Sequence, residues 1–406
     1  MRNLALLVLL FSAFPVQAVG TRLTYYGSLE GHSEDDEEVT STLTLALDDK
    51  QYWSNYINEY DLALSWLYDH RGDEDSDTQF TGFYRGDYLI TRSSSVIWNF
   101  DADFEVLPED SGEEVDDFAS QNLTVLSTGP TLNLFRNLRG TTELTALYSD
   151  IHYSESDLDS TQEEVNLSHA YPLSSNRKLT LTLYYVSTEF DDSINKDSDY
   201  DANTLSLAYD TTGRNWSLLL VGGYTELDNV SDPDGQPLLE LDFQYRTSSR
   251  STLFLNAKDA LESTIEYNQS NPTENNDLFL SSPLRSKRIS LGFEYRYQQD
   301  LYEATVYTEE IEVIFADSEP EEINGGSLSF TRYVGEQWVY FLGIDVSENN
   351  LLDDRFESLD ASVTYRRQHT VATRSEIKLA LEADRSDDTD VDDYIIGYRF
   401  VTDLYR

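Results

Sequence analysis

The sequence predicts an all-β fold: an antiparallel transmembrane β-barrel of about 18–20 strands, with short periplasmic turns and long acidic extracellular loops. Three observations support this prediction. The chain begins with an export signal, apolar and polar side chains alternate along segments of about ten residues, and the connections between these segments are of two alternating kinds.

The first residues have the three parts of a secretory signal. Arg2 supplies a positive charge, residues 4–16 are mostly apolar, and small residues around Ala18 fit a cleavage site. The apolar run is also compatible with a membrane anchor, but it is shorter than the ~20 apolar residues that a spanning helix needs. We therefore expect a signal peptide at residues 1–18. A single barrel domain is expected at residues 19–406, because no linker-like stretch interrupts them.

The composition excludes several classes of protein. The absence of cysteine excludes a disulfide scaffold and a thiolate metal site. The net charge of −48 is typical of disorder, but 28 Tyr, 18 Phe and 5 Trp are too many aromatic side chains for a disordered acidic chain. An excess of 76 acidic over 28 basic residues repels phosphates, so we expect no nucleic-acid partner.

A strand period of two starts at Thr21 and recurs to the end of the chain. Residues 239–246, 288–297 and 376–382 each place apolar side chains on one face and polar or ionic side chains on the other. A soluble β-sandwich also alternates, but its strands are usually about five or six residues long, whereas a bilayer needs about nine to eleven. Most of the alternating segments reach the longer figure, which favours a membrane barrel.

Aromatic residues concentrate toward the ends of the expected strands, as interfacial girdles require. Examples are Tyr25, Tyr26, Tyr148, Tyr209 and Tyr297. Because an open sheet edge cannot face lipid, such strands must close into a barrel.

The connections alternate between long acidic loops and short polar or basic turns. The long loops are expected at residues 33–38, 72–77, 109–117, 155–164, 191–201, 228–234, 262–282, 317–322, 348–354 and 384–393. The short turns include residues 91–93, 137–140, 175–178, 212–215 and 247–250. Ten loops and nine turns imply about twenty strands, with both termini in the periplasm. Eighteen strands stays open, because residues 262–282 and the boundary near Leu301 can be divided in more than one way. The acidic residues are expected to lie largely in the loops, and the turns carry Arg and Lys.

The polar faces of the strands are expected to line the lumen, where ionisable groups are tolerated. The expected acidic lumen residues are Glu143, Glu240, Asp242, Glu294, Asp360, Glu376 and Glu382. The expected basic ones are Arg246, Arg288, Arg296, Arg366, Lys378 and Arg399. Their mixed signs fit both a transport path and structural ladders of opposite charge between neighbouring strands, so no single selectivity residue is chosen.

The sequence holds few candidates for catalysis. The five histidines are His32, His70, His152, His169 and His369. Asp69–His70 and His32–Ser33 pair residue types found in membrane-barrel hydrolases, but adjacent residues on a strand point to opposite faces. We expect no catalytic residue and no enzymatic activity.

Carboxylates spaced by two residues in the loops suggest cation binding. They occur at Asp73, Asp75 and Asp77, at Asp197, Asp199 and Asp201, and at Asp388, Asp390 and Asp392. None continues with the Gly and Glu of a Ca²⁺ loop. Solvated acidic loop tips are the better interpretation, and we expect no metal site and no cofactor.

Short phrases resemble those of a known group of barrels. Residues 125–134 resemble its "fSTGP" strand, residues 148–159 its acidic "Y.d...SdLDS" segment, and residues 167–185 its "LSH.LSP.tTLSL" phrase, which residues 249–253 repeat. On these residues the chain resembles the outer-membrane β-barrel proteins associated with PEP-CTERM and exopolysaccharide systems. The resemblance implies a role in producing or exporting extracellular polysaccharide and carries over no catalytic residue. The chain departs from the usual barrel-assembly signal, because the alternation up to Phe400 is followed by Leu404-Tyr405-Arg406.

These observations predict an outer-membrane pore or surface component linked to exopolysaccharide export. Two alternatives stay open: a cation-preferring general porin, and a structural or adhesive surface barrel. The expected partners are outer-membrane lipid and lipopolysaccharide, with polysaccharide and divalent cations as further candidates at the acidic loops.

Overall fold

The computed structural model describes residues 20–31, 37–52, 55–69, 76–90, 95–108, 120–137, 140–154, 159–191, 199–228, 235–262, 283–314, 320–334, 338–351, 354–370, 373–385 and 390–405. The signal peptide expected at residues 1–18 lies outside the described residues. Within them, no helix is long and apolar enough to cross a bilayer.

Twenty β-strands make up the described structure. They are β1 (Gly20–Gly31), β2 (Glu37–Tyr52), β3 (Tyr56–Asp69), β4 (Ser76–Leu89), β5 (Val96–Pro108), β6 (Ser120–Asn137), β7 (Gly140–Tyr153), β8 (Ser160–Ser174), β9 (Arg177–Phe190), β10 (Tyr200–Thr212), β11 (Trp216–Asp228), β12 (Gln236–Arg246), β13 (Ser251–Glu262), β14 (Leu284–Tyr297), β15 (Asp300–Val313), β16 (Glu321–Val334), β17 (Trp338–Leu351), β18 (Asp354–Gln368), β19 (Thr373–Arg385) and β20 (Asp390–Tyr405). The count is at the upper end of the predicted range. It also settles the end of the last strand, which runs to Tyr405.

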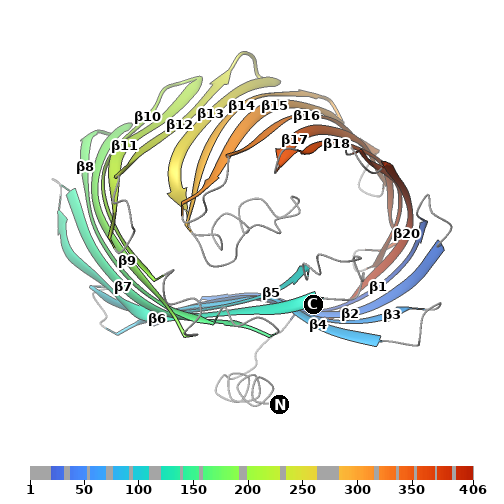
Figure 1. Cartoon of the computed structure of the whole chain (residues 1–406), viewed down its shortest axis with the longest axis horizontal. Coiled ribbons are helices and arrows are strands. Elements are labelled where there is room, and N and C mark those ends of the chain that lie inside the picture. The colour runs from blue at the N-terminus through green and yellow to red at the C-terminus, as the bar shows by residue number, and fades with distance from the viewer. Residues whose placement is uncertain are drawn as a thin grey trace.

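The strands form one closed ring (Figure 1). Each strand pairs antiparallel with its neighbours in sequence, and β1 closes the ring by pairing with β20, with Tyr26 opposite Arg399. Closure satisfies the backbone hydrogen-bonding groups of the first and last strands, which lipid would otherwise leave unpaired. The predicted all-β antiparallel barrel is therefore confirmed.

The connections alternate as predicted, with ten from odd- to even-numbered strands on one side and nine on the other. The length predicted for several of the ten is wrong. Between β17 and β18 the connection is only residues 352–353, not 348–354, and β8 already begins at Ser160 inside the loop expected at 155–164. Both segments are rich in acidic and amide side chains, and in the sequence this composition favours loops. Such a segment still forms a strand above the bilayer, because backbone pairing needs no apolar face.

The acidic residues are also less confined to loops than predicted. Glu309, Glu321 and Glu348 lie within β15, β16 and β17. Glu309 and Glu321 are buried. Part of the negative charge of the chain is therefore built into the barrel wall, where Arg288 of the neighbouring strand supplies a cation to Glu309.

One face of the wall is apolar and exposed, which identifies it as the lipid-facing side. Large apolar side chains keep between a third and two thirds of their surface accessible, and examples are Leu181, Leu205, Leu220, Leu239, Leu291, Leu328, Leu342, Leu379 and Ile396. Residues opposite one another in an antiparallel register share a face. The residues that lie between the exposed apolar ones along each strand point to the other face and therefore line the lumen. Among the residues that the structure describes, buried apolar side chains form small clusters on the wall and not one central core.

Aromatic rings gather near the turn side of the lipid-facing surface, in a set that we call the turn-side belt. The belt comprises Phe293, Tyr295, Tyr297, Tyr302, Phe330, Trp338, Tyr340 and Tyr365, from β14 to β18. Ring centroids of Tyr302 and Phe330 are 4.9 Å apart, and those of Trp338 and Tyr365 are 5.3 Å apart. Tyr297 is the one predicted example in this belt, so the girdle is confirmed for β14 to β18, whereas the side chains of Tyr25 and Tyr26 lie outside the described residues.

The lumen face carries apolar clusters near the loop side. Leu123, Ile151 and Tyr153 form one cluster on β6 and β7, and Leu284, Ile311 and Ile323 form another on β14 to β16. The sequence did not indicate them, because each strand contributes only one or two such side chains.

Candidate functional site

The lumen wall holds the ionisable groups that the fold brings together. Glu240, Lys258, Arg288 and Glu309 are consecutive partners in the registers of β12, β13, β14 and β15. Nη1 of Arg288 lies 3.2 Å from Oε2 of Glu309, and Ser286 Oγ donates a hydrogen bond of 2.9 Å to Oε1. A buried carboxylate requires such partners, because its desolvation is costly. We call this cross-strand row the β12–β15 ladder.

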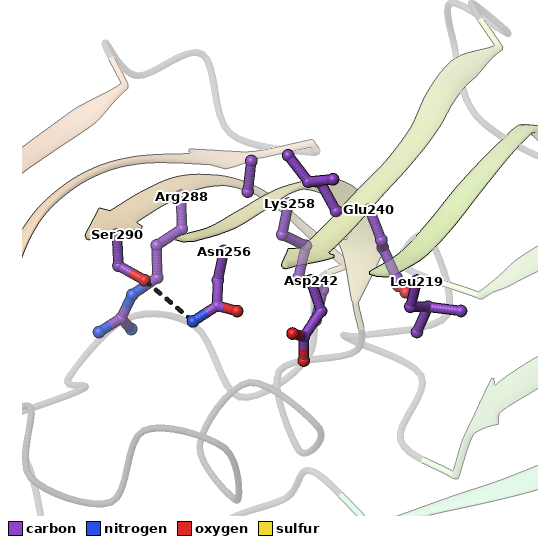
Figure 2. A pocket seen from close by; sticks show the side chains of 9 residues that line it. Leu219, Glu240, Asp242, Asn256, Lys258, Arg288 and Ser290 are labelled. Carbon is purple, nitrogen blue, oxygen red and sulfur yellow. Dashed lines mark hydrogen bonds between the residues drawn. The ribbon is translucent and has the colours of Figure 1, made fainter. Parts of the chain in front are cut away.

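A recess of about 510 Å³ lies beside this ladder. Leu219, Asp242, Asn256 and Ser290 line it together with ladder residues. Figure 2 shows that Asp242, Asn256 and Arg288 project from the same side of their strands. Asn256 Nδ2 approaches Ser290 Oγ at 3.5 Å, which is a weak hydrogen bond. The recess therefore offers carboxylates, cations, an amide and a hydroxyl to a solute in the lumen.

A second ladder follows β2 to β5, where Lys50, Glu59, Arg85 and Asp101 are consecutive partners in register. Lys50 Nζ forms an ion pair with Glu59, and Arg85 Nε lies 3.5 Å from Oδ2 of Asp101. Asp103 follows on the same face, two residues along β5. Figure 1 places β4 and β5 across the ring from β12 and β13, so the two ladders occupy opposite walls.

A third group joins β18, β19 and β20. Arg366 Nε donates to Glu376 Oε2 at 2.6 Å, and Glu376 is opposite Arg399 in the next register. Lys378 lies on the same face, two residues along β19. Acidic and basic side chains alternate across neighbouring strands here, as in the β2–β5 ladder, whereas the β12–β15 ladder has two adjacent cations, Lys258 and Arg288, between two carboxylates.

The predicted lumen residues fall on the face that the registers assign to the lumen. This holds for Glu143, Glu240, Asp242, Arg246, Arg288, Glu294, Arg296, Arg366, Glu376, Lys378 and Arg399. Positions 360 and 382 are opposite one another on β18 and β19, but their side chains lie outside the described part of the chain.

Sequence reasoning missed several ladder residues: Lys50, Glu59, Arg85, Asp101, Lys258 and Glu309. The same alternation rule places each of them on the lumen face. The pairing partners could not be read from the sequence, because register depends on which strands meet and at what offset.

The described histidines do not form one site. His152 Nδ1 binds Asp159 Oδ2 at 2.6 Å, His169 Nδ1 binds Thr142 Oγ1 at 2.8 Å, and His369 Nε2 binds Ser375 Oγ at 2.7 Å. They lie on or next to three different strands, β7, β8 and β18, and within the described residues no carboxylate hydrogen-bonds to His369 to complete a triad. His32, Ser33 and His70, and the side chain of Asp69, lie outside the described residues.

The carboxylate triplets are only partly described. Asp199 accepts a hydrogen bond from the Phe190 amide at 2.8 Å, and Asp201 accepts one from the Tyr185 hydroxyl at 3.1 Å, so both have structural partners. Asp73, Asp75, Asp197 and Asp388 lie outside the described residues. Among the residues that are described, no group of three His, Asp or Glu side chains is arranged to hold a metal ion.

No protein-family model matches the chain, and no curated protein matches it. Solved structures do match. The siderophore receptor PirA from Pseudomonas aeruginosa aligns with a TM-score of 0.55 and 12% identity, covering 96% of this chain and 81% of that one. The FrpB iron transporter from Neisseria meningitidis (F3-3 variant) aligns with a TM-score of 0.53 and 9% identity, covering 95% and 82%.

These matches, together with the closed ring and its apolar outer face, decide the class and location of the chain. It is a bacterial outer-membrane β-barrel. At such low identity the likeness concerns the fold alone.

Proposed function

We propose that the barrel is a pore for hydrophilic solutes. The observation that carries the proposal is the distribution of ionisable side chains over the lumen face, in ladders on opposite walls of a closed ring. A barrel whose interior was packed dry would have to desolvate these groups. Each ion left unpaired in a dry interior would cost roughly several kcal/mol of desolvation free energy. The arrangement therefore favours a hydrated interior.

The size of the ring supports the same proposal. Eight strands leave an interior that side chains fill, whereas barrels of about 16–18 strands or more enclose a lumen wide enough for an aqueous channel. Twenty strands belong to the second group. The proposal assigns passage of solutes to the barrel and no chemical conversion.

We further propose that the pore prefers cations. The chain carries 76 acidic and 28 basic residues. The two acidic and two basic residues of the second ladder balance one another, and Asp103 beside them adds one further negative charge. A path lined by excess negative charge raises the local concentration of cations.

Planar-bilayer recording of the refolded barrel tests both statements. We expect discrete conductance steps in KCl and, in a salt gradient, a reversal potential of the sign that marks cation preference. Absence of any conductance would exclude a pore, and binding of polymer that depends on the loops would then favour a structural or adhesive surface barrel. A reversal potential of opposite sign would keep the pore and remove its cation preference.

The resemblance to barrels of exopolysaccharide systems motivates a proposal about the cargo, namely that the pore serves the export of extracellular polysaccharide. A deletion strain tests it, with extracellular polysaccharide and small-solute uptake measured side by side. We expect less extracellular polysaccharide. Unchanged polysaccharide with altered solute permeability would instead indicate a general porin.

A further inference from the structure

Three arginines at the turn side, Arg250, Arg332 and Arg367, lie over rings of the turn-side belt. The guanidinium carbon of Arg250 is 5.0 Å from the ring centroid of Tyr297, and that of Arg367 is 4.7 Å from the ring centroid of Trp338. Both distances are within the range of cation–π contacts. We call Arg250 and Arg367 the rim arginines.

The rim arginines belong to the lipid-facing surface and not to the lumen. Arg367 is opposite Trp338 in the β17–β18 register and shares its face with Tyr365, two residues earlier. Arg250 immediately precedes β13 and reaches Tyr297, which is exposed on the lipid face of β14. Both arginines are exposed. The charge therefore lies at the edge of the apolar band, where phospholipid headgroups lie.

A neighbouring arginine at the same rim differs from these two, because its guanidinium group is paired with a carboxylate. Arg332 stacks on Phe330 at 5.6 Å, but its Nε and Nη2 donate to both carboxylate oxygens of Asp300 at 2.7 and 2.8 Å. Within the described residues, no carboxylate lies within ion-pair distance of either rim arginine. Arg250 and Arg367 thus keep their guanidinium donors directed to the interface.

We propose that the rim arginines bind the phosphates of anionic phospholipids in the periplasmic leaflet, whose acyl chains then lie along the turn-side belt. The guanidinium group matches a phosphate in geometry as well as in charge, and its stacking on Tyr297 or Trp338 fixes its orientation before the lipid arrives. In a chain with a net charge of −48, this positive rim is a local reversal of sign. Charge complementarity therefore favours an anionic lipid over a zwitterionic one.

Trp338 provides a built-in reporter for the experiment. In a variant in which the other tryptophans are changed to Phe, brominated phosphatidylglycerol and brominated phosphatidylcholine are compared as quenchers of Trp338 fluorescence in mixed vesicles. We expect phosphatidylglycerol to associate about fivefold more strongly, the preference expected for one arginine near a membrane surface. The preference should fall with added salt.

Arginines on the other face at similar height supply a matched control. Arg367→Gln should abolish the preference at Trp338, whereas the lumen-facing double variant Arg246→Gln, Arg296→Gln removes charge from the same end of the barrel and should leave it intact. A second reporter, a variant that retains only Trp66 on the loop side of β3, should show no preference for phosphatidylglycerol.

Native mass spectrometry of the barrel with all its tryptophans gives an independent readout. Phosphatidylglycerol retained by the wild type should be reduced in the Arg250→Gln, Arg367→Gln double variant. Equal quenching of Trp338 by the two lipids, or equal loss of preference in the lumen-facing variant, would overturn the proposal. Conductance is not part of this test, so a pore that fails to conduct would leave it standing.

Discussion

At the scale of single residues, the ion pair between Arg288 and Glu309 determines whether a buried charge in the wall is compensated. The Glu309 side chain is fully buried, and the Arg288 side chain keeps a third of its surface exposed. We expect Arg288→Gln to lower the free energy of unfolding by about 3 kcal/mol, at the low end for breaking a buried pair because Arg288 is partly hydrated. Equilibrium unfolding of the barrel in urea, in lipid vesicles, measures the change.

A double-mutant cycle distinguishes this effect from a general loss of packing. Adding Glu309→Gln should recover most of the stability, since the uncompensated charge is then removed. Arg332→Gln is a useful comparison, because the Arg332 side chain is 52% exposed in its pair with Asp300 and should affect unfolding much less. If the double variant were as unstable as Arg288→Gln, charge compensation would not be the cause.

At the scale of elements, the β6–β7 contact depends on the absence of a side chain at Gly129. A Cβ there would lie 1.9 Å from the carbonyl oxygen of Ala146 on β7, and the next residue, Pro130, has no amide hydrogen to donate. The phrase Ser127-Thr128-Gly129-Pro130, which carries the family resemblance, therefore marks a close approach of two strands.

Substitution of Gly129 tests this approach. We expect Gly129→Ala to lower the free energy of unfolding by about 1–3 kcal/mol, because the two backbones must separate. Gly222→Ala on β11 is the control, since an added Cβ meets no atom within 4 Å there, and it should be neutral or stabilising by about 0.4–1 kcal/mol. Thermal denaturation followed by gel mobility compares the two variants. Equal losses would show that strand glycines act only through flexibility.

At the scale of the whole molecule, we expect the placement of charge on opposite walls to determine the ion selectivity of the proposed pore. The changes Asp101→Asn and Asp103→Asn remove two negative charges from the wall that carries the second ladder. They should lower the cation-to-anion permeability ratio by roughly two- to fivefold in dilute salt, with less effect at high salt. Reversal potentials in a KCl gradient give the ratio. Asp150 on β7 pairs with Leu126 in the β6–β7 register, so it lies on the face that points away from the lumen. Asp150→Asn should therefore leave the ratio unchanged. A ratio that responded to Asp150 alone would place the selective path elsewhere.

Much of the fold was predictable because the signals are local. The side-chain period of two along residues 288–297 assigned Arg288 to the lumen and Leu291 to lipid without any knowledge of neighbours. The extent of the loops was not predictable in the same way. Glu348, Asn349 and Asn350 are polar residues on both faces of the chain, and only the pairing of this segment with β18 makes it strand.

The candidate site was likewise predictable only in part. Arg288 and Glu240 were predicted as lumen residues, but their joining through Lys258 to the buried Glu309 was not. Lys258 and Arg288 are separated by the connection between β13 and β14, so their placement opposite one another depends on the offset at which two distant segments meet.

The sequence by itself determined that this chain is a membrane barrel, which side its loops occupy and which residues face its lumen, because backbone geometry alone imposes alternation and strand length. Tertiary structure decided that twenty strands close through β1 and β20, and which charges become partners. Those outcomes depend on the hydrogen-bond registers between strands. A register is set by two segments together, so it cannot be read from either segment alone.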